Sequence, residues 1–296
     1  MPLRNYFLFP CLFFLLTSAA LPLGAQIPAP ADERPLAVAA TSIMADLVEV
    51  IGGGLVRVET PVPAEEDPHG YRPTAANLEQ LRGADLVLRN GLGLDEWLDP
   101  PLEEIASATP VFTLTTGIQP ITPGANGPTP DPHAWMTAAN GITYLKNVLR
   151  ALVTIDSNNA DIYQFNHDIY LRQLEEVEQA TKNRIAAVPE QQRYLVPVHG
   201  LIYFTRHYGI RTEEEQENLS IAIDSLYVDA LSDPAGPAAT YLDLLRHNTD
   251  LVISIMESNP PFRKISADRP GHGKYLLAAL IVLLISGFIY RSVRRK

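Results

Sequence analysis

The chain has 296 residues, enough for about two domains, and 46% of them are hydrophobic, which suits sizeable cores. Its 34 acidic residues against 23 basic ones give a formal net charge of −11. This charge argues against nucleic acid as a partner and favours solubility outside a cell and the attraction of cations. The single cysteine, Cys11, lies in the N-terminal apolar run. A transition-metal site in the mature chain must therefore use histidine and carboxylate.

Both ends of the chain have the composition of targeting segments. Residues 1–25 combine an early arginine, an apolar run and small residues, which predicts a cleaved secretory signal peptide. Residues 275–290 are almost continuously apolar and precede a basic tail, 291–296. We expect them to form a transmembrane anchor with the tail in the cytoplasm and the body in the periplasm or at the cell surface. A cleaved C-terminal sorting signal has the same layout. Residues 259–274, rich in proline, glycine and charge, are typical of a tether.

Between these ends, short apolar strands alternate with helical patterns. The predicted strands are 36–40, 56–62, 85–88, 111–114, 194–198 and 226–230. The predicted helices are 42–51, 74–82, a piece from Trp97, 138–152, 159–187, a piece with Tyr203 and Phe204, and 240–256. This alternation predicts an α/β fold of parallel βαβ units, in which ligands bind beyond the carboxyl ends of the strands.

The longest helical pattern predicts the domain organisation. Residues 159–187 have no proline or glycine and would span about 40 Å, enough for a rigid spine between two lobes. Its helically spaced apolar residues are Ile162, Phe165, Ile169, Leu174 and Val177, and His167 among polar neighbours is expected to be a solvated surface residue. We expect an N-terminal α/β lobe at 26–156, the spine at 157–188 and a short C-terminal α/β lobe at 189–258.

Three histidines follow prolines in similar surroundings. The tripeptide Asp-Pro-His occurs at 67–69 and again at 131–133, and His199 follows Val-Pro-Val. Proline stiffens the backbone, so each imidazole is presented with little freedom to lose on binding. Neutral imidazole is a common ligand of first-row transition metals, and we expect His69, His133 and His199 to share one ion. Asp67 and Asp131 either orient the imidazoles from behind or cap the turns.

A fourth ligand is expected at Asp229, inside the predicted strand 226–230. A charged residue in an apolar strand is unusual unless it is paired or coordinated. A turn or helix-capping role for Asp229 is the alternative. With three imidazoles and one carboxylate, Zn²⁺ is the most natural ion, and Mn²⁺, which prefers more oxygen ligands, is the alternative.

Five stretches in a fixed order carry a family resemblance. They are 67–74 (DPHGYRPT), 90–97 (NGLGLDEW), 131–135 (DPHAW), 198–204 (VHGLIYF) and 226–231 (LYVDAL), with Thr240, Tyr241 and Asn248 after them. Through them the chain resembles the periplasmic or surface metal-binding proteins of zinc and manganese ABC importers. The resemblance implies two lobes with metal in the cleft between them, held by His69 and His133 from the first lobe and His199 and Asp229 from the second. It also implies an ABC permease and its ATPase as partners. We expect a monomer and no enzyme.

The chain departs from that family in two respects. Residues 208–225 leave room for little more than one short helix, so the second lobe looks shortened. The apolar C-terminal segment is also not typical of the family. Because of these departures, two alternative functions stay open: a membrane-anchored surface adhesin and a degenerate scaffold of the same fold. A zinc hydrolase, with three histidines and an open position for water, is less favoured because the body has no His-Glu-x-x-His pattern.

Overall fold

The computed structural model describes residues 33–63, 66–105, 109–123, 129–212 and 225–260, and those from Arg34 on belong to one compact unit. The predicted signal peptide and the predicted anchor at 275–290 lie outside the described residues. Among the described residues, no helix is long and apolar enough to cross a membrane.

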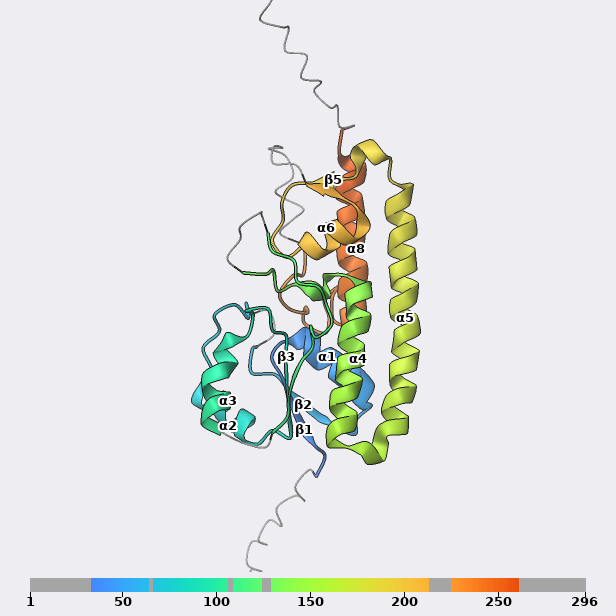
Figure 1. Ribbon diagram of the computed structural model, residues 1–296. Helices are drawn as coiled ribbons and strands as arrows, with labels where there is room; N and C mark the ends of the chain where they lie inside the picture. The colour runs from blue at the N-terminus through green and yellow to red at the C-terminus, as the bar shows by residue number, and fades with distance from the viewer. Residues whose placement is uncertain (1–32, 64–65, 106–108, 124–128, 213–224, 261–296) are drawn as a thin grey trace, which may run out of the picture. The chain divides into compact units, whose positions relative to one another are not determined.

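Four parallel strands form the main sheet, in the order β2-β1-β3-β4. They are β1 (Leu36–Ala39), β2 (Arg57–Glu59), β3 (Leu86–Arg89) and β4 (Val111–Thr113). In the register, Val38 of β1 lies opposite Glu59 of β2 and Val87 of β3. Figure 1 shows α1 (Ser42–Gly52) and α4 (Ala138–Ile155) on one side of the sheet and α2 (Ala75–Arg82) and α3 (Asp99–Ile105) on the other. Helices on both faces explain why all of β1 is buried, as parallel sheets require.

Threonine caps set the start of the helices around this sheet. In α2 (Ala75–Arg82), Thr74 and Asn77 form a reciprocal capping box, so the helix start predicted at Thr74 is confirmed. Thr41 caps α1 (Ser42–Gly52), and Thr137 caps α4 (Ala138–Ile155). The remaining short elements of this part are η1 (Glu96–Leu98), α3 (Asp99–Ile105), η2 (Ala134–Met136) and η3 (Ser157–Asn159).

The long helix α5 (Ala160–Ala187) packs along α1, α4 and α8 (Tyr241–Ser258) (Figure 1). Its buried face includes Leu174 and Val177 of the predicted apolar pattern but not the other three residues. Ile162, Phe165 and Ile169 are 46%, 65% and 38% exposed. The buried positions on this helix are Tyr163, His167, Tyr170, Leu174, Val177, Thr181 and Ile185. Tyrosine, threonine and histidine can be buried with their polar atoms bonded, and the apolar pattern alone does not show which face the neighbouring helices cover.

The prediction that His167 is a solvated surface residue is therefore wrong. The residue is 5% exposed, with Nδ1 2.9 Å from Oδ1 of Asp168. Its helix face lies against neighbouring helices, so the polar sequence around it does not decide its burial.

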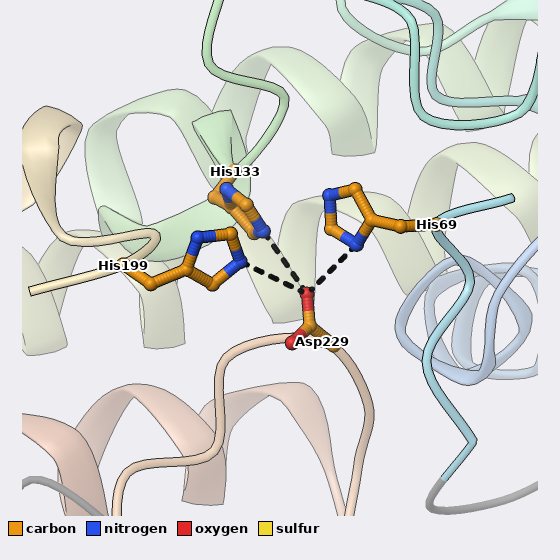
Figure 2. A group of neighbouring side chains, drawn as sticks. All are labelled: His69, His133, His199 and Asp229. Carbon is orange, nitrogen blue, oxygen red and sulfur yellow. Dashed lines mark hydrogen bonds and ion pairs between the residues drawn. The ribbon is translucent and has the colours of Figure 1, made fainter. Parts of the chain in front are cut away.

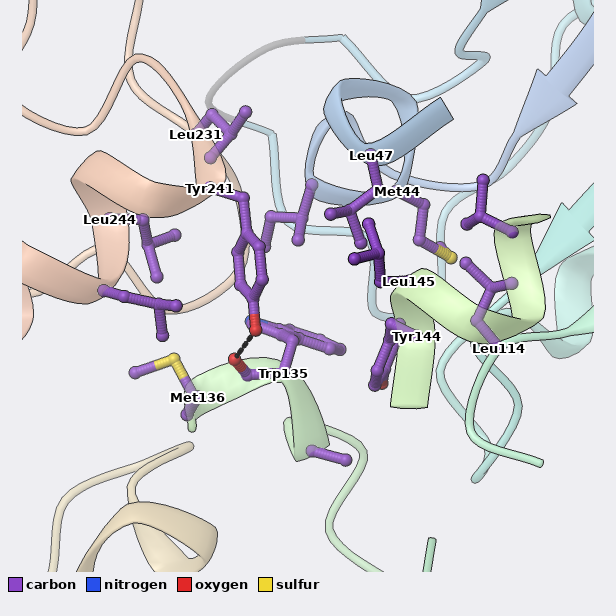
Figure 3. Packing of buried hydrophobic residues seen from close by; sticks show 14 of the residues in the cluster. Met44, Leu47, Leu114, Trp135, Met136, Tyr144, Leu145, Leu231, Tyr241 and Leu244 are labelled. Carbon is purple, nitrogen blue, oxygen red and sulfur yellow. Dashed lines mark hydrogen bonds between the residues drawn. The ribbon is translucent and has the colours of Figure 1, made fainter. Parts of the chain in front are cut away.

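The second part of the fold has a small sheet of two parallel strands, β5 (Tyr194–Leu195) and β6 (Arg211–Thr212). Its helical elements are η4 (Glu190–Gln192), α6 (Ile202–Tyr208) and α8 (Tyr241–Ser258). Buried apolar side chains form one cluster through both parts; Figure 3 shows Tyr241 of α8 beside Trp135, in the same cluster as Met44 and Leu145. The second part is thus packed on the first through a shared core.

The predicted strand at 226–230 is wrong, because this segment is irregular and pairs with no strand among the described residues. Side chains take its backbone groups instead. The amide of Asn248 in α8 accepts from the N–H of Tyr227 (3.1 Å) and donates to its carbonyl (2.7 Å). This one side chain thus bonds both backbone groups of Tyr227, as a neighbouring strand would. The pattern of residue types in the sequence does not show whether a strand or a side chain supplies these bonds.

Candidate functional site

The two Asp-Pro-His tripeptides adopt the same local geometry. Oδ1 of Asp67 accepts from the backbone N–H of His69 and lies within hydrogen-bond distance of its Nδ1, both at 2.7 Å. Oδ1 of Asp131 makes the same two contacts with His133, both at 2.9 Å. Each aspartate therefore accepts from the backbone of its turn and faces Nδ1 of the ring, a geometry compatible with either predicted role.

His133 lies at the start of η2 and its side chain is fully buried. The turn before it is held from the sheet edge, where the side chain of Asn90, just after β3, donates to the carbonyl of Pro132 (3.0 Å). Asn90 is itself fixed by the hydroxyl of Tyr144 in α4. The backbone of His133 is thus tied to the end of β3, where open α/β sheets place their ligands.

His199 follows β5 on a loop, and its side chain is 66% exposed. The next residue, Gly200, has φ +73°, a conformation that favours glycine. A Cβ at Gly200 would overlap Cγ1 of Val228 and lie 3.1 Å from Cγ of His133. The missing side chain therefore lets the His199 loop approach both His133 and the segment that carries Asp229.

Asp229 is carried by an irregular segment before α8, and side chains of separate elements hold its backbone. Besides Asn248 on Tyr227, the indole N–H of Trp135 donates to the carbonyl of Val228 (2.9 Å). On the other side, the N–H of Leu231 donates to Oγ of Ser42 at the start of α1 (3.0 Å). These bonds fix the segment on both sides of the carboxylate.

These segments bring the four predicted ligand residues together, as Figure 2 shows. One ligand atom from each of His69, His133, His199 and Asp229 can be chosen so that all lie within 4.8 Å of one another. Oδ1 of Asp229 lies 3.0 Å from Nε2 of His133, 3.5 Å from Nδ1 of His69 and 3.9 Å from Nε2 of His199. A tetrahedral zinc ion with bonds of about 2.1 Å holds its ligand atoms about 3.4 Å apart. The donor set and spacing therefore fit one transition-metal ion after a small inward movement. Nδ1 of His69, which also faces Asp67, must then exchange that contact for the ion, or the ring must turn to present Nε2.

The pKa values of the histidines and carboxylates in the cluster depend on one another. Burial pushes the pKa of His133 down, but the hydrogen bonds and charges of Asp131 and Asp229 outweigh it and raise the pKa above its ordinary value. Burial pushes the pKa of Asp229 up, but His133 and the charges of His69 and His199 bring it below its ordinary value. A proton on the imidazole thus compensates the carboxylates, and a bound cation would displace it.

Two open hollows meet at the exposed His199. One, of about 420 Å³, is lined by Glu66, Asp67, His199 and Asp229 among others. The second, of about 510 Å³, lies on the α6 side and reaches Asp131 and Arg206. Water and ions can therefore reach the cluster at His199, whereas His133 closes it from the buried side.

The remaining histidines of the described residues lie in other surroundings. His207 pairs with Glu178 of α5 (2.6 Å), and Nε2 of His247 faces the carbonyl of Ser225 (3.1 Å). His167 pairs with Asp168. His272 lies outside the described residues.

Several residues that support the site were not predicted as part of it, namely Asn90, Trp135, Gly200 and Asn248. All four lie within or just after the five stretches that carry the resemblance. Trp135 also follows the second Asp-Pro-His at the place where Tyr71 follows the first. Their roles depend on contacts with distant segments, which the sequence pattern does not show.

Comparisons with known proteins identify the family of the chain. Residues 37–222 match the family model described as "Zinc-uptake complex component A periplasmic" (ZnuA). The iron-binding protein YfeA of Yersinia pestis is 27% identical over 80% of this chain and 91% of its own length. The iron ABC transporter substrate-binding lipoprotein MtsA of Streptococcus pyogenes is 31% identical over 64% of this chain and 68% of its own.

A solved structure has the same fold. The Mn-bound periplasmic metal binding protein from candidatus Liberibacter asiaticus superposes with a TM-score of 0.68 and 27% identity, over 75% of this chain and all of that one. The family model covers more than half of the chain. The chain therefore belongs to the Zinc-uptake complex component A periplasmic family, the metal-binding solute-binding proteins of ABC importers, which are not enzymes.

Proposed function

We propose that this protein captures a divalent transition metal outside the cytoplasmic membrane through His69, His133, His199 and Asp229 and delivers it to an ABC permease driven by its ATPase. The observation that carries the proposal is the approach of these four side chains, from four separate segments, to within 4.8 Å. Three imidazoles and one carboxylate form a closed donor set, which suits capture of an ion.

Zinc is the proposed cargo and manganese the alternative. Three nitrogen donors and one oxygen donor suit Zn²⁺, whereas Mn²⁺ favours more oxygen. Similar proteins are named for iron, and the compared structure holds manganese, so members of this fold differ in their metal. A second oxygen from Asp229, or a water at the exposed side, would adapt the same site to Mn²⁺.

The proposed organisation is two lobes, 26–156 and 189–258, joined by the spine at 157–188, in a monomer. In support, α5 packs against α1 and α4 as well as against α8. A helix held on both sides limits hinge motion, so release would depend on movement of loops. Small-angle scattering profiles with and without metal should be closely similar, and a large compaction on binding would contradict this.

We also propose that residues 1–25 direct export and that 275–290 anchor the protein beside its permease. The anchor would raise the effective concentration of the loaded protein at the transporter. Membrane fractionation of cells that express the full chain, compared with a chain ending at residue 274, tests this. The shorter chain should be released from the membrane fraction.

The decisive experiment is metal content and competition binding of the purified protein. Wild type should hold about one zinc, His133→Ala should lose it, and Asp229→Ala should bind more weakly. His207→Ala is the matched control, because this histidine pairs with Glu178 and lies outside the cluster. If Asp229→Ala changes nothing, the fourth ligand is another group or water.

The degenerate scaffold remains the second candidate, because the second sheet has only two short strands among the described residues. A folded wild-type protein without metal in every competition assay would favour it.

A further inference from the structure

Trp135 contacts both the segment of His133 and the segment of Asp229 in the proposed metal site. It lies two positions after His133 in η2, is 1% exposed, and its ring centroid is 5.1 Å from that of His133 at an interplanar angle of 65°. Its indole N–H donates to the carbonyl of Val228, the residue before Asp229. One side chain thus contacts both the most buried histidine and the backbone that presents the carboxylate.

The backbone of Trp135 is fixed from the far end of the same segment. The hydroxyl of Tyr241, the first residue of α8, donates to the carbonyl of Trp135 (2.6 Å; Figure 3). Tyr241 is fully buried, and a Cβ at Gly141 of α4 would lie 2.5 Å from its Oη, so the tyrosine ring fits only against a glycine. Trp135 is therefore bonded to the chain on both sides of the loop 228–241.

The Asp229 segment depends on such bonds because no strand in the described part of the chain pairs with it. Its flanking backbone groups bond to side chains of Asn248, Trp135 and Ser42. Among these three, Trp135 alone belongs to a segment that carries one of the proposed ligands. Its bond therefore relates the position of Asp229 directly to that of His133, whose Nε2 lies 3.0 Å away.

We propose that Trp135 is a positioning residue of the metal site: its indole N–H holds the Val228 carbonyl and keeps Asp229 within bonding distance of His133 before a metal arrives. This inference rests on the proposed function and deepens it. Groups that orient metal ligands commonly change affinity about 10- to 100-fold when removed. Asp229, the proposed fourth ligand, is then held in position by the buried segment that carries His133 and Trp135.

The chain offers a matched control, because it has two tryptophans. Trp97, in η1, also has a buried indole N–H, but no hydrogen-bond partner is found for it in the described part of the chain. Trp97→Phe removes an indole without removing such a bond, whereas Trp135→Phe keeps an aromatic ring and loses the bond to Val228.

The test is a double-mutant cycle on the full chain, with zinc and manganese affinities measured by competition with a chelator. Trp135→Phe should weaken binding about tenfold, and Trp97→Phe should change it less than about twofold. In the Asp229→Ala background, Trp135→Phe should have almost no further effect, because the group that it positions is gone. An equal loss in both backgrounds, or none in either, would overturn the proposal.

A second readout needs no metal. In the metal-free protein, hydrogen exchange of peptides covering 226–231 should be faster in Trp135→Phe than in wild type and in Trp97→Phe. Unchanged exchange in these peptides overturns the proposal about Trp135, whether or not the wild type binds metal. Failure of the wild type to bind metal would instead contradict the proposed function. If Trp135→Phe does not fold, replacement of Trp135 by benzothienylalanine, which keeps the shape and lacks the N–H, is judged by the same two criteria.

Discussion

The two sides of the proposed metal site are built differently. His133 is fully buried, its Nδ1 faces Asp131, and its turn is bonded to Asn90 at the sheet edge. His199 is 66% exposed and stands between two open hollows. His133 therefore belongs to a preorganised half that includes Asp229, whereas His199 can move without breaking buried bonds. Such a division suits a carrier, which must hold an ion firmly and still release it.

The largest expected effect is the contrast between these two histidines. His133→Ala should lower metal affinity more than about a hundredfold, because it also leaves two carboxylates without their partner. His199→Ala should lower it about tenfold, since water can take the exposed position. Chelator-challenge rates should show faster release from His199→Ala while capture persists. A larger loss in His199→Ala than in His133→Ala would contradict the comparison.

The next effect tests how closely the exposed loop approaches the buried half. Gly200→Ala introduces a side chain at φ +73° that would overlap Val228, whereas Gly209→Ala has nearly the same φ, +67°, and open space around the new Cβ. Both should lose about 1–2 kcal/mol of stability from the left-handed backbone. Only Gly200→Ala should also lose metal affinity, by about tenfold. Thermal unfolding measures the loss of stability in both variants, and competition binding measures the loss of metal affinity. Equal affinity losses in the two variants would show that the overlap with Val228 is not what weakens binding.

A further effect concerns the dependence of stability on pH. Asp46 of α1 accepts from the N–H of Tyr241 (3.0 Å), and burial, helped by the charges of Glu49 and Asp243, raises the pKa of Asp46 to about 6. The folded chain thus takes up a proton that the unfolded chain, titrating near 3.8, does not. The contribution of Asp46 to the free energy of unfolding should therefore increase as pH falls from about 7 to 4, by at most about 3 kcal/mol.

Asp46→Asn should remove this pH dependence while keeping an acceptor for Tyr241. Denaturant unfolding of both proteins between pH 4 and 7 measures it. Parallel pH profiles for the two proteins would show that Asp46 is already charged in the folded chain.

The smallest effect lies on the exposed side and has the opposite sign. Glu178 of α5 bonds His207 and Tyr208 of α6, the helix after His199. Burial pushes the pKa of Glu178 up, but these partners and Lys182 outweigh it and lower the pKa to about 2. Its contribution is present above pH 4.5 and lost as pH falls towards 2. The side chain of Glu178 is 12% exposed, and Gln keeps an oxygen acceptor for these partners but loses the charge. Glu178→Gln should therefore cost about 1 kcal/mol at pH 7, and urea unfolding should show the difference vanishing in acid.

The sequence predicted the parts of the site that depend on local chemistry. Proline before each histidine and aspartate two residues before His69 and His133 determine a turn and a ring orientation within a few residues. Threonine at a helix start is equally local, so the start at Thr74 was predicted correctly. The three histidines could be predicted for the same reason, whereas Asp229 was chosen as a charged residue in a predicted strand that the structure does not show.

Three features were decided only by tertiary structure. Leu226 to Ala230 has the composition of a strand, yet Asn248, Trp135 and Ser42 take the backbone bonds of this region. The buried face of α5 runs through Tyr163 and His167 rather than Ile162 and Phe165, because neighbouring helices cover that side.

The third feature is the distance between His133 and Asp229, which depends on a bond between residues 93 positions apart. By itself the sequence determined the local backbone conformation and the chemistry of the donor groups, since neighbouring residues set both. Which face is buried and which carbonyl a side chain reaches depend on segments far apart in the chain, and these meet only in the folded protein.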